Sequence, residues 1–162
     1  MKHCVIKDDV TMGRNVKIYS FVNLYGCTIG DDTSIGTFVE IQDDAAIGNG
    51  CKISSHSFIC TGVTIGHGCF IGHGVVFIND NYPRSLNDRG ELEGPEDWSD
   101  RYVPTIVGNN VSIGSNATIL GGITIGDAAL IGAGAVVTKD VPGGTTAVGN
   151  PARLTGSQGI DL

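Results

Sequence analysis

Residues 29–77 read IGDDTSIGTFVEIQDDAAIGNGCKISSHSFICTGVTIGHGCFIGHGVVF, with a bulky apolar residue at every sixth position. An α-helix repeats its apolar face at spacings of three and four, and a strand alternates every two residues, so neither has this period. A six-residue period is typical of a parallel β-helix, in which each repeat forms a short strand and a turn, and coils stack. The period residues here are Ile29, Ile35, Ile41, Ile47, Ile53, Ile59, Ile65, Ile71 and Phe77.

The same period extends to both sides of this stretch. An earlier run is out of phase by one residue and contains Ile6, Met12, Ile18 and Leu24, and a later run contains Val107, Ile113, Ile119, Ile125, Ile131 and Val137. With three repeats to a coil, the sequence predicts about six coils. A glycine often follows the period residue, where we expect a corner with the positive φ that glycine adopts readily. The fourth residue after the period residue is small or β-branched, and we expect it to point inward as well.

Length and composition agree with one stacked unit. The 162 residues, which include 25 Gly and one Trp, suit a single solenoid domain (1–162), because each coil packs only on its neighbours. The net charge of −7 argues against nucleic-acid or membrane-surface binding, which needs clustered Lys and Arg. No run approaches the roughly 18 apolar residues of a membrane span, and the start lacks a signal peptide. We expect a cytoplasmic protein.

The period fails in two places, and these are where we expect function. About 78–106 forms a charged and aromatic insertion, and a loop of this length inside a compact domain is usually functional. The period returns in register at Val107, which predicts that the loop is ejected from a corner. A C-terminal extension of about 141–162 follows the last repeat.

The closing string IGDAALIGAGAVVTKDVP (125–142), followed by GNPAR (149–153), resembles the left-handed β-helix acyltransferases of the hexapeptide-repeat superfamily. The resemblance implies an all-β, left-handed parallel β-helix of about six triangular coils, with one long ejected loop and a short C-terminal tail. FINDNYPRS (77–85), then EDW (96–98) and VPT (103–105), resembles the N-acetyltransferases that act on UDP- or dTDP-linked amino sugars. That likeness implies an acetyl-CoA-dependent homotrimer, without a metal, whose active sites lie between neighbouring subunits.

Acetyl transfer to an amine needs a neutral nucleophile, a proton acceptor and donors for the oxyanion. Galactoside and chloramphenicol acetyltransferases of the superfamily carry a catalytic His before Pro at the loop, whereas this chain has NDNYP (79–83), which favours an amine over a hydroxyl acceptor. Asn79 and Asp80 are predicted to position the amine, and its proton to leave through Asp80 or water, with His56 or His73 as further candidate acceptors.

Further residues are candidates for binding. The candidates for the nucleotide sugar are Glu40, Tyr82 and Arg84, of which Arg84 offers a forked phosphate donor. The resemblance implies a coenzyme A site made of Ser115, Ala133, Thr138, Lys139 and Arg153.

Three alternatives stay open at this point. O-acetylation of a sugar or another small hydroxyl acceptor requires His56 or His73 as base. A γ-carbonic-anhydrase-like zinc protein needs three converging imidazoles, for which His56, His67 and His73 are available. A purely structural solenoid is the third alternative, and the charged loop and GNPAR (149–153) argue against it.

Overall fold

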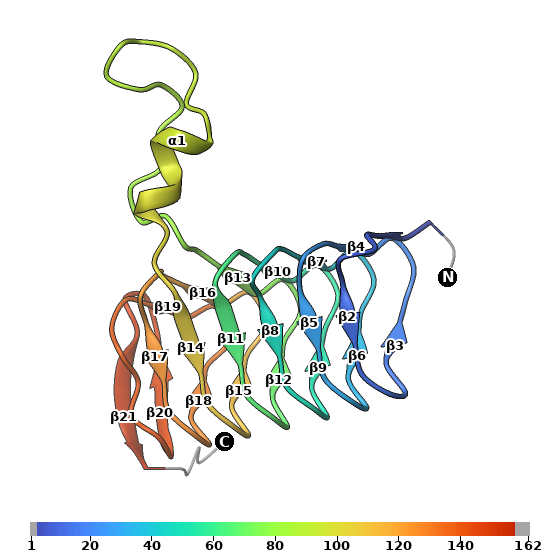
Figure 1. Cartoon of the computed structure of the whole chain (residues 1–162). Coiled ribbons are helices and arrows are strands. Elements are labelled where there is room, and N and C mark those ends of the chain that lie inside the picture. Colours follow the sequence, from blue (N-terminus) through green and yellow to red (C-terminus); the bar gives the residue numbers. More distant parts are fainter. Residues whose placement is uncertain (1–2, 158–162) are drawn as a thin grey trace.

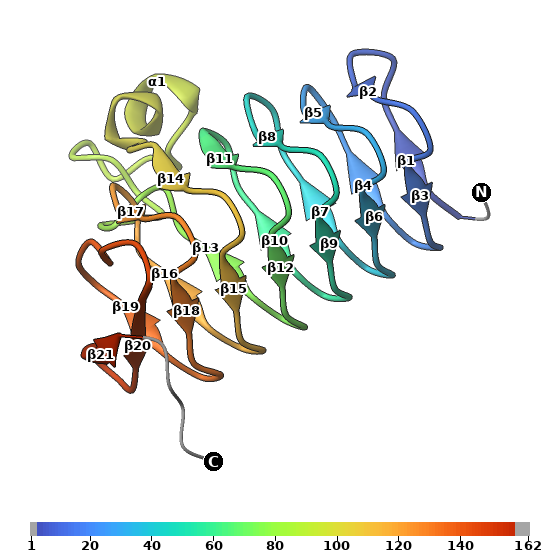
Figure 2. The same cartoon turned by 90° about the horizontal axis from the view of Figure 1, so that it is seen from below.

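The computed structural model describes residues 3–157, and the chain winds into a stack of coils with three sides (Figure 1). Each side is a sheet of short parallel strands, because consecutive strands turn a corner and pair with the strand one coil away. Figure 2 views the coils from below and shows the stack running from the N-terminus to β20 and β21. The parallel β-helix predicted from the period is confirmed.

The strands fall into three sheets, which we call A, B and C. Sheet A contains β1 (Val5–Ile6), β4 (Asn23–Leu24), β7 (Glu40–Ile41), β10 (Phe58–Ile59), β13 (Val76–Phe77), β16 (Thr118–Ile119) and β19 (Val136–Val137). Sheet B contains β2 (Thr11–Met12), β5 (Thr28–Ile29), β8 (Ala46–Ile47), β11 (Val63–Ile65), β14 (Thr105–Val107) and β17 (Thr124–Ile125). Sheet C contains β3 (Lys17–Ile18), β6 (Ser34–Ile35), β9 (Lys52–Ile53), β12 (Phe70–Ile71), β15 (Ser112–Ile113), β18 (Leu130–Ile131), β20 (Thr145–Val148) and β21 (Arg153–Ser157). The stack is slightly longer than the six coils that the repeat count predicts.

The interior is filled by the period residues. From Leu24 to Val137, every one of them is at most 3 % exposed. Ile6, Met12 and Ile18 are less buried, because the first coil packs on a neighbour from one side only. Cys51 and Cys69 occupy the second inward position and are buried, as expected of small apolar side chains.

The glycines that follow the period residues have a different role from the one predicted. The prediction assigned them positive φ, but Gly30, Gly48 and Gly66 have ordinary φ values. They are required because the next coil lies too close for a side chain: a Cβ on Gly48 would lie 2.6 Å from the carbonyl carbon of Gly66. The coil-to-coil backbone hydrogen bonds, such as Gly48 N to Ile65 O at 2.8 Å, hold this distance.

Positive φ occurs two residues later, at the third corner position. There Gly50 and Gly68 share the position with non-glycine residues of other coils such as Asp32 and Asn110, all with φ between 55° and 67°. Asn and Asp tolerate this conformation better than other side chains. Phe38 and His56 adopt it at another corner, with φ of 59° and 63°.

The long loop leaves the stack at the corner between sheets A and B. β13 ends at Phe77 and β14 begins at Thr105, and the chain between them carries α1 (Pro95–Trp98) and the 3-10 helix η1 (Ser99–Arg101). Figure 1 shows this segment projecting from the stack. At the C-terminal end, β20 and β21 pair antiparallel. Residues 158–162 of the predicted extension lie outside the described part. Among the described residues, no helix is long and apolar enough to cross a bilayer.

Two glycine substitutions separate the two reasons for glycine at the corners. Gly48→Ala forces two backbones apart and should lower the free energy of unfolding by about 3 kcal/mol or more. Gly50→Ala has nothing within 4 Å of its new Cβ, so it should cost only the ~1–2 kcal/mol of a left-handed conformation. Urea unfolding of both variants measures the difference. Equal losses would show that φ, rather than the contact between coils, decides the residue type.

Candidate functional site

The corner between sheets C and A brings both candidate catalytic histidines together with part of the predicted coenzyme site. Its second position carries one column of residues along the stack, namely Thr37, Ser55, His73, Ser115 and Ala133. The third position carries a parallel column containing His3, Phe21, Phe38 and His56. His56 and His73 are both exposed.

His73 is oriented by two serines of the same column. Its Nδ1 lies 2.7 Å from Ser55 Oγ, and its backbone N donates to Ser115 Oγ at 3.2 Å. If Nδ1 carries the hydrogen and donates it to Ser55, Nε2 is unprotonated and can accept a proton. If Ser55 donates instead, Nε2 carries the hydrogen and His73 is a donor. The pair therefore leaves Nε2 as the nitrogen that can meet a substrate.

His56 ends a row of stacked rings. The ring centroids of His3 and Phe21 lie 5.1 Å apart, those of Phe21 and Phe38 5.1 Å, and those of Phe38 and His56 4.9 Å. The spacing follows from one ring per coil. Phe21 and Phe38 are about half exposed, so this row is an apolar strip on the surface that ends in an imidazole.

Asn79 and Asp80 lie at the next corner, between sheets A and B, where the loop begins. Asn79 Nδ2 donates to Thr61 O at 3.2 Å, and its backbone carbonyl accepts from Val103 N at 2.9 Å, which joins the two ends of the loop. Asp80 accepts from the Tyr82 amide and from Arg101 Nε, both at 2.9 Å. Within one subunit, the structure therefore does not bring Asn79 and Asp80 to the corner that carries the histidines.

Arg101 organises this part of the loop. Its guanidinium makes a forked pair with Glu93, at 2.6 and 2.9 Å, beside its contact with Asp80. Partial burial acts to raise the pKa of Asp80, but hydrogen bonds from the Tyr82 amide and Arg101 outweigh it and lower the pKa. Asp80 is therefore a weak proton acceptor.

The predicted substrate residues are spread around the same corner. Glu40 lies on the outer face of sheet A and accepts from Gln42 Nε2 at 3.0 Å. Tyr82 is 82 % exposed on the loop. Arg84 pairs with Asp88 at 3.0 Å and with Glu93 at 3.5 Å, and it lines a hollow of about 200 Å³ with Asn79, Asp80, Pro83, Glu93, Trp98, Arg101 and Tyr102.

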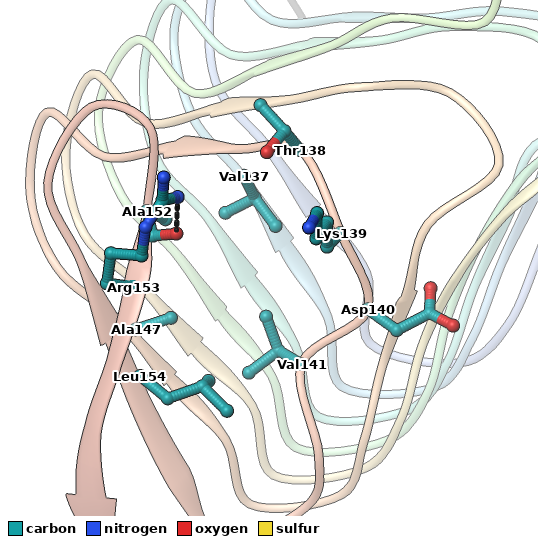
Figure 3. Close-up of a pocket in the computed structure, with 9 residues that line it drawn as sticks. All are labelled: Val137, Thr138, Lys139, Asp140, Val141, Ala147, Ala152, Arg153 and Leu154. Atoms are coloured by element: carbon teal, nitrogen blue, oxygen red, sulfur yellow. Dashed lines mark hydrogen bonds between the residues drawn. The ribbon is translucent and has the colours of Figure 1, made fainter.

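Three of the predicted coenzyme residues line a cavity of about 270 Å³ at the C-terminal end of the stack. Figure 3 shows Thr138, Lys139 and Arg153 around it, with apolar side chains of the last coil inside. Arg153 Nη1 donates to Ala152 O at 3.0 Å. The remaining lining residues are Val137, Asp140, Val141, Ala147, Ala152 and Leu154. Ser115 and Ala133 are not part of this cavity and lie in the column of His73.

Sequence reasoning missed Arg101, Glu93 and Ser55. The loop contains many charged residues, so the sequence does not single out Arg101 and Glu93. Only the folded loop brings Arg101 to Glu93 and Asp80. Ser55 precedes His73 by 18 residues, which is one coil. That spacing is the signal that could have found it.

His67 occupies a different corner and belongs to a structural ladder. Its Nδ1 accepts from Asn49 N at 2.9 Å, and its own N donates to Asn109 Oδ1 at 2.9 Å. Over residues 3–157, no three or more His, Cys, Asp or Glu side chains are grouped in a way that could hold a metal ion.

Comparison with known proteins places these features in context. The repeat pattern described as Bacterial transferase hexapeptide (six repeats) matches residues 26–61 and 104–139, on either side of the loop. The chain is 29% identical over 153 residues to the bifunctional protein GlmU of Synechococcus sp. (strain CC9605), covering 91% of this chain and 32% of that protein. GlmU of Nitratidesulfovibrio vulgaris (strain DP4) is 30% identical, with 90% and 32% covered. The chain thus spans about a third of these curated relatives.

Two solved structures share the fold. A hexapeptide-repeat-containing acetyltransferase from Vibrio cholerae O1 biovar eltor, complexed with acetyl coenzyme A, has a TM-score of 0.61 and 26% identity, covering 92% of this chain and 70% of that one. A variant of AntD, an N-acyltransferase from Bacillus cereus in complex with dTDP-4-amino-4,6-dideoxyglucose and coenzyme A, has a TM-score of 0.77 at 20% identity, covering 92% and 84%. At that identity the second likeness shows the fold alone.

The contact of Arg101 with Asp80 and Glu93 predicts how firmly the loop is held. In Arg101→Gln, the amides of Tyr82 and Val103 should exchange hydrogen at least about tenfold faster, because the charge-assisted hydrogen bonds to Asp80 and Glu93 are lost. Hydrogen exchange followed by NMR measures this. Arg89→Gln is the matched control, since the Arg89–Glu91 pair is exposed on both sides and should contribute little. Unchanged exchange in Arg101→Gln would remove Arg101 as the anchor of the loop.

Proposed function

From the hexapeptide-repeat matches on both sides of the loop, we propose that the chain is an acetyltransferase acting on a nucleotide-linked amino sugar. In this proposal, it transfers the acetyl group of acetyl-CoA to an amine of a UDP- or dTDP-linked sugar, for polysaccharide or glycan precursor synthesis. The observation that carries the proposal is the column that aligns Ala133 and Ser115 with His73 and Ser55 at one corner of the stack. A cytoplasmic location is part of the proposal, since acetyl-CoA is the donor.

The donor side is supported by charge and by shape. Lys139 and Arg153 border the C-terminal cavity, and neither has a carboxylate within ion-pair distance in residues 3–157. They suit the phosphates of coenzyme A. Ala133 and Ser115 lie in the column of His73, and their backbone groups can pair with the amides of the pantetheine arm. Lys139 follows β19 at the corner between sheets A and B, where Asn79 lies, so in this proposal the coenzyme spans from that corner to the column of His73.

The chemical step needs a proton acceptor for the amine. The ring of His73, held through Nδ1 by Ser55, presents Nε2 to the amine, and His56 is exposed on the adjacent column. The side-chain carbonyl of Asn79 is suited to accept a hydrogen bond from the amine and orient its lone pair. Asp80, paired with Arg101, fixes the start of the loop rather than taking the proton.

Assembly completes the site in this proposal. Asn79 lies at one corner of sheet A and His73 at another, so a neighbouring subunit is needed to place the two groups on one substrate. We propose the homotrimer that the sequence resemblance implies. The half-exposed rings of Phe21 and Phe38 support self-association at the corner between sheets C and A, because contiguous apolar surface usually marks an interface.

O-acetylation of a hydroxyl acceptor is the second candidate, and the Ser55–His73 contact favours it. An alcohol must lose its proton during attack, so a fixed imidazole is required. An amine that binds in its neutral form attacks without prior loss of a proton, so it depends less on a base.

The donor site is tested by thiol release with acetyl-CoA and a panel of UDP- and dTDP-linked amino sugars. We expect release with at least one of them. In the double variant Lys139→Gln and Arg153→Gln, the KM for acetyl-CoA should rise at least about tenfold, since charge-assisted contacts to phosphate are lost. Lys7→Gln, which removes a lysine lying over Tyr25, is the control. An unchanged KM in the double variant would remove Lys139 and Arg153 from the site, and no release with any amino sugar would overturn the proposed acceptor.

The two acceptor classes predict different effects of the histidines. For amine transfer, His73→Ala, His56→Ala and Asn79→Ala should each lower kcat by less than about tenfold, whereas loss of a required base costs about 10²–10⁴-fold. Steady-state rates with the best amino sugar measure this. A fall of several orders of magnitude in either histidine variant would show that the chain needs an obligate base, as O-acetylation does.

A further inference from the structure

The positively charged side chains of this acidic chain fall into two groups: those that pair with a carboxylate and those that do not. Four arginines form ion pairs, namely Arg14 with Asp31, Arg84 with Asp88, Arg89 with Glu91 and Arg101 with Asp80. No ion pair is found in residues 3–157 for Lys7, Lys17, Lys52, Lys139 or Arg153. Lys139 and Arg153 border the C-terminal cavity, and Lys7 lies 5.5 Å from the Tyr25 ring centroid. Lys17 and Lys52 are left without an assigned role.

Lys17 and Lys52 flank one serine on the outer face of sheet C. Lys17 of β3 is in register with Ser34 of β6, and Ser34 is in register with Lys52 of β9. Neighbouring strands lie about 4.8 Å apart, so the two lysines leave the same face about two strand spacings from each other, with the Ser34 hydroxyl between them. An anion that lies over Ser34 can attract both ammonium groups.

The surface is hollowed at this place. A hollow of about 310 Å³ is lined by Lys52 and Ser34, and an adjoining one of about 580 Å³ by Lys17 and Ser34. Ser34 belongs to both, so they form one groove along sheet C. The first hollow is also lined by Tyr19, Thr37, Ser55 and His73.

The rest of the lining is compatible with an anion. One carboxylate borders the groove, that of Asp32 at the far rim, and it accepts from Asn15 Nδ2 at 3.0 Å. Lys52 Nζ lies 5.8 Å from the ring centroid of Phe70, which is in register with Lys52 on the side away from Ser34, so the Lys52 side chain must turn from this ring to hold an anion over Ser34. The groove thus offers two unpaired ammonium groups, several hydroxyls and an imidazole, which are the donors that recognise phosphate.

We propose that this groove binds the diphosphate of the acceptor, with Lys17, Lys52 and the Ser34 hydroxyl holding its oxygens. The inference rests on the proposed function, and it names the residues that bind the nucleotide part of the substrate. Coenzyme A is the other source of phosphate, but its phosphates are matched by Lys139 and Arg153 at the opposite end of the stack (Figure 1). Because His73 also lines the groove, a sugar attached to the diphosphate can reach the histidine that meets the thioester in the proposed function.

The double variant Lys17→Gln and Lys52→Gln tests the assignment. We expect the KM for the acceptor to rise at least about tenfold, because two charge-assisted contacts are lost, with kcat within about twofold and the KM for acetyl-CoA unchanged. Lys7→Gln removes the same charge elsewhere and should change neither constant. An unchanged acceptor KM overturns the proposal. A rise in the KM for acetyl-CoA instead also overturns it, because the groove then serves the coenzyme.

A binding measurement keeps this inference separate from the proposed function. Inorganic diphosphate is titrated calorimetrically into the Lys139→Gln, Arg153→Gln protein, which lacks the other cation pair, and into the same protein carrying Lys17→Gln and Lys52→Gln as well. We expect binding to the first and none to the second, with equal thermal midpoints showing that both are folded. Equal binding to both, or none to either, overturns the groove. Loss of binding in the second protein, together with no acetylation of any amino sugar by the unmodified protein, sustains the groove and overturns the proposed function.

Discussion

Adjacent coils lie one strand spacing apart, and the hydrogen bonds between their backbones set what every position can hold. Gly48 N donates to Ile65 O at 2.8 Å, and at this distance a Cβ on Gly48 would touch the backbone of Gly66. At the corner between sheets B and C, the first position is therefore glycine in every coil from Gly13 to Gly126, while the strand positions must alternate between the interior and the surface. Long stretches of the chain are explained by this single contact between coils.

The same contact turns the linear chain into columns. His73 meets Ser55, one coil of 18 residues earlier, and Ser115, which follows 42 residues later. The second interval is longer because the loop leaves after β13 and returns at β14 without disturbing the register. A polar residue placed at the corner is thus aligned with its counterparts on other coils, and a row of them forms a track along the stack.

Among the described residues, ion pairing neutralises the arginines of the loop and leaves several cations of the stack unpaired. The loop neutralises its own arginines, since Arg101 and Arg84 both contact Glu93, whose side chain is 2 % exposed. Lys139 and Arg153 at one end of the stack, and Lys17 and Lys52 toward the other, have no such partner within residues 3–157. In a chain of net charge −7, cations that no carboxylate neutralises attract phosphate groups more strongly than paired ones.

The six-residue period of the aliphatic residues determined the parallel β-helix, the inward positions and the corner from which the loop leaves. It could do so because each coil packs only on its neighbours, which makes the packing pattern local in sequence. Only the structure explains the corner glycines, because a Cβ on Gly48 collides with the next coil, whose position the local sequence does not give.

The site also depended on tertiary structure, because its residues are distant in the sequence. Ser55 meets His73, and Lys17 and Lys52 flank Ser34, only when the coils stack. Arg101 meets Asp80 only when the loop folds. Asn79 and His73, which the sequence grouped as one site, lie at different corners because three strands and three turns make one coil.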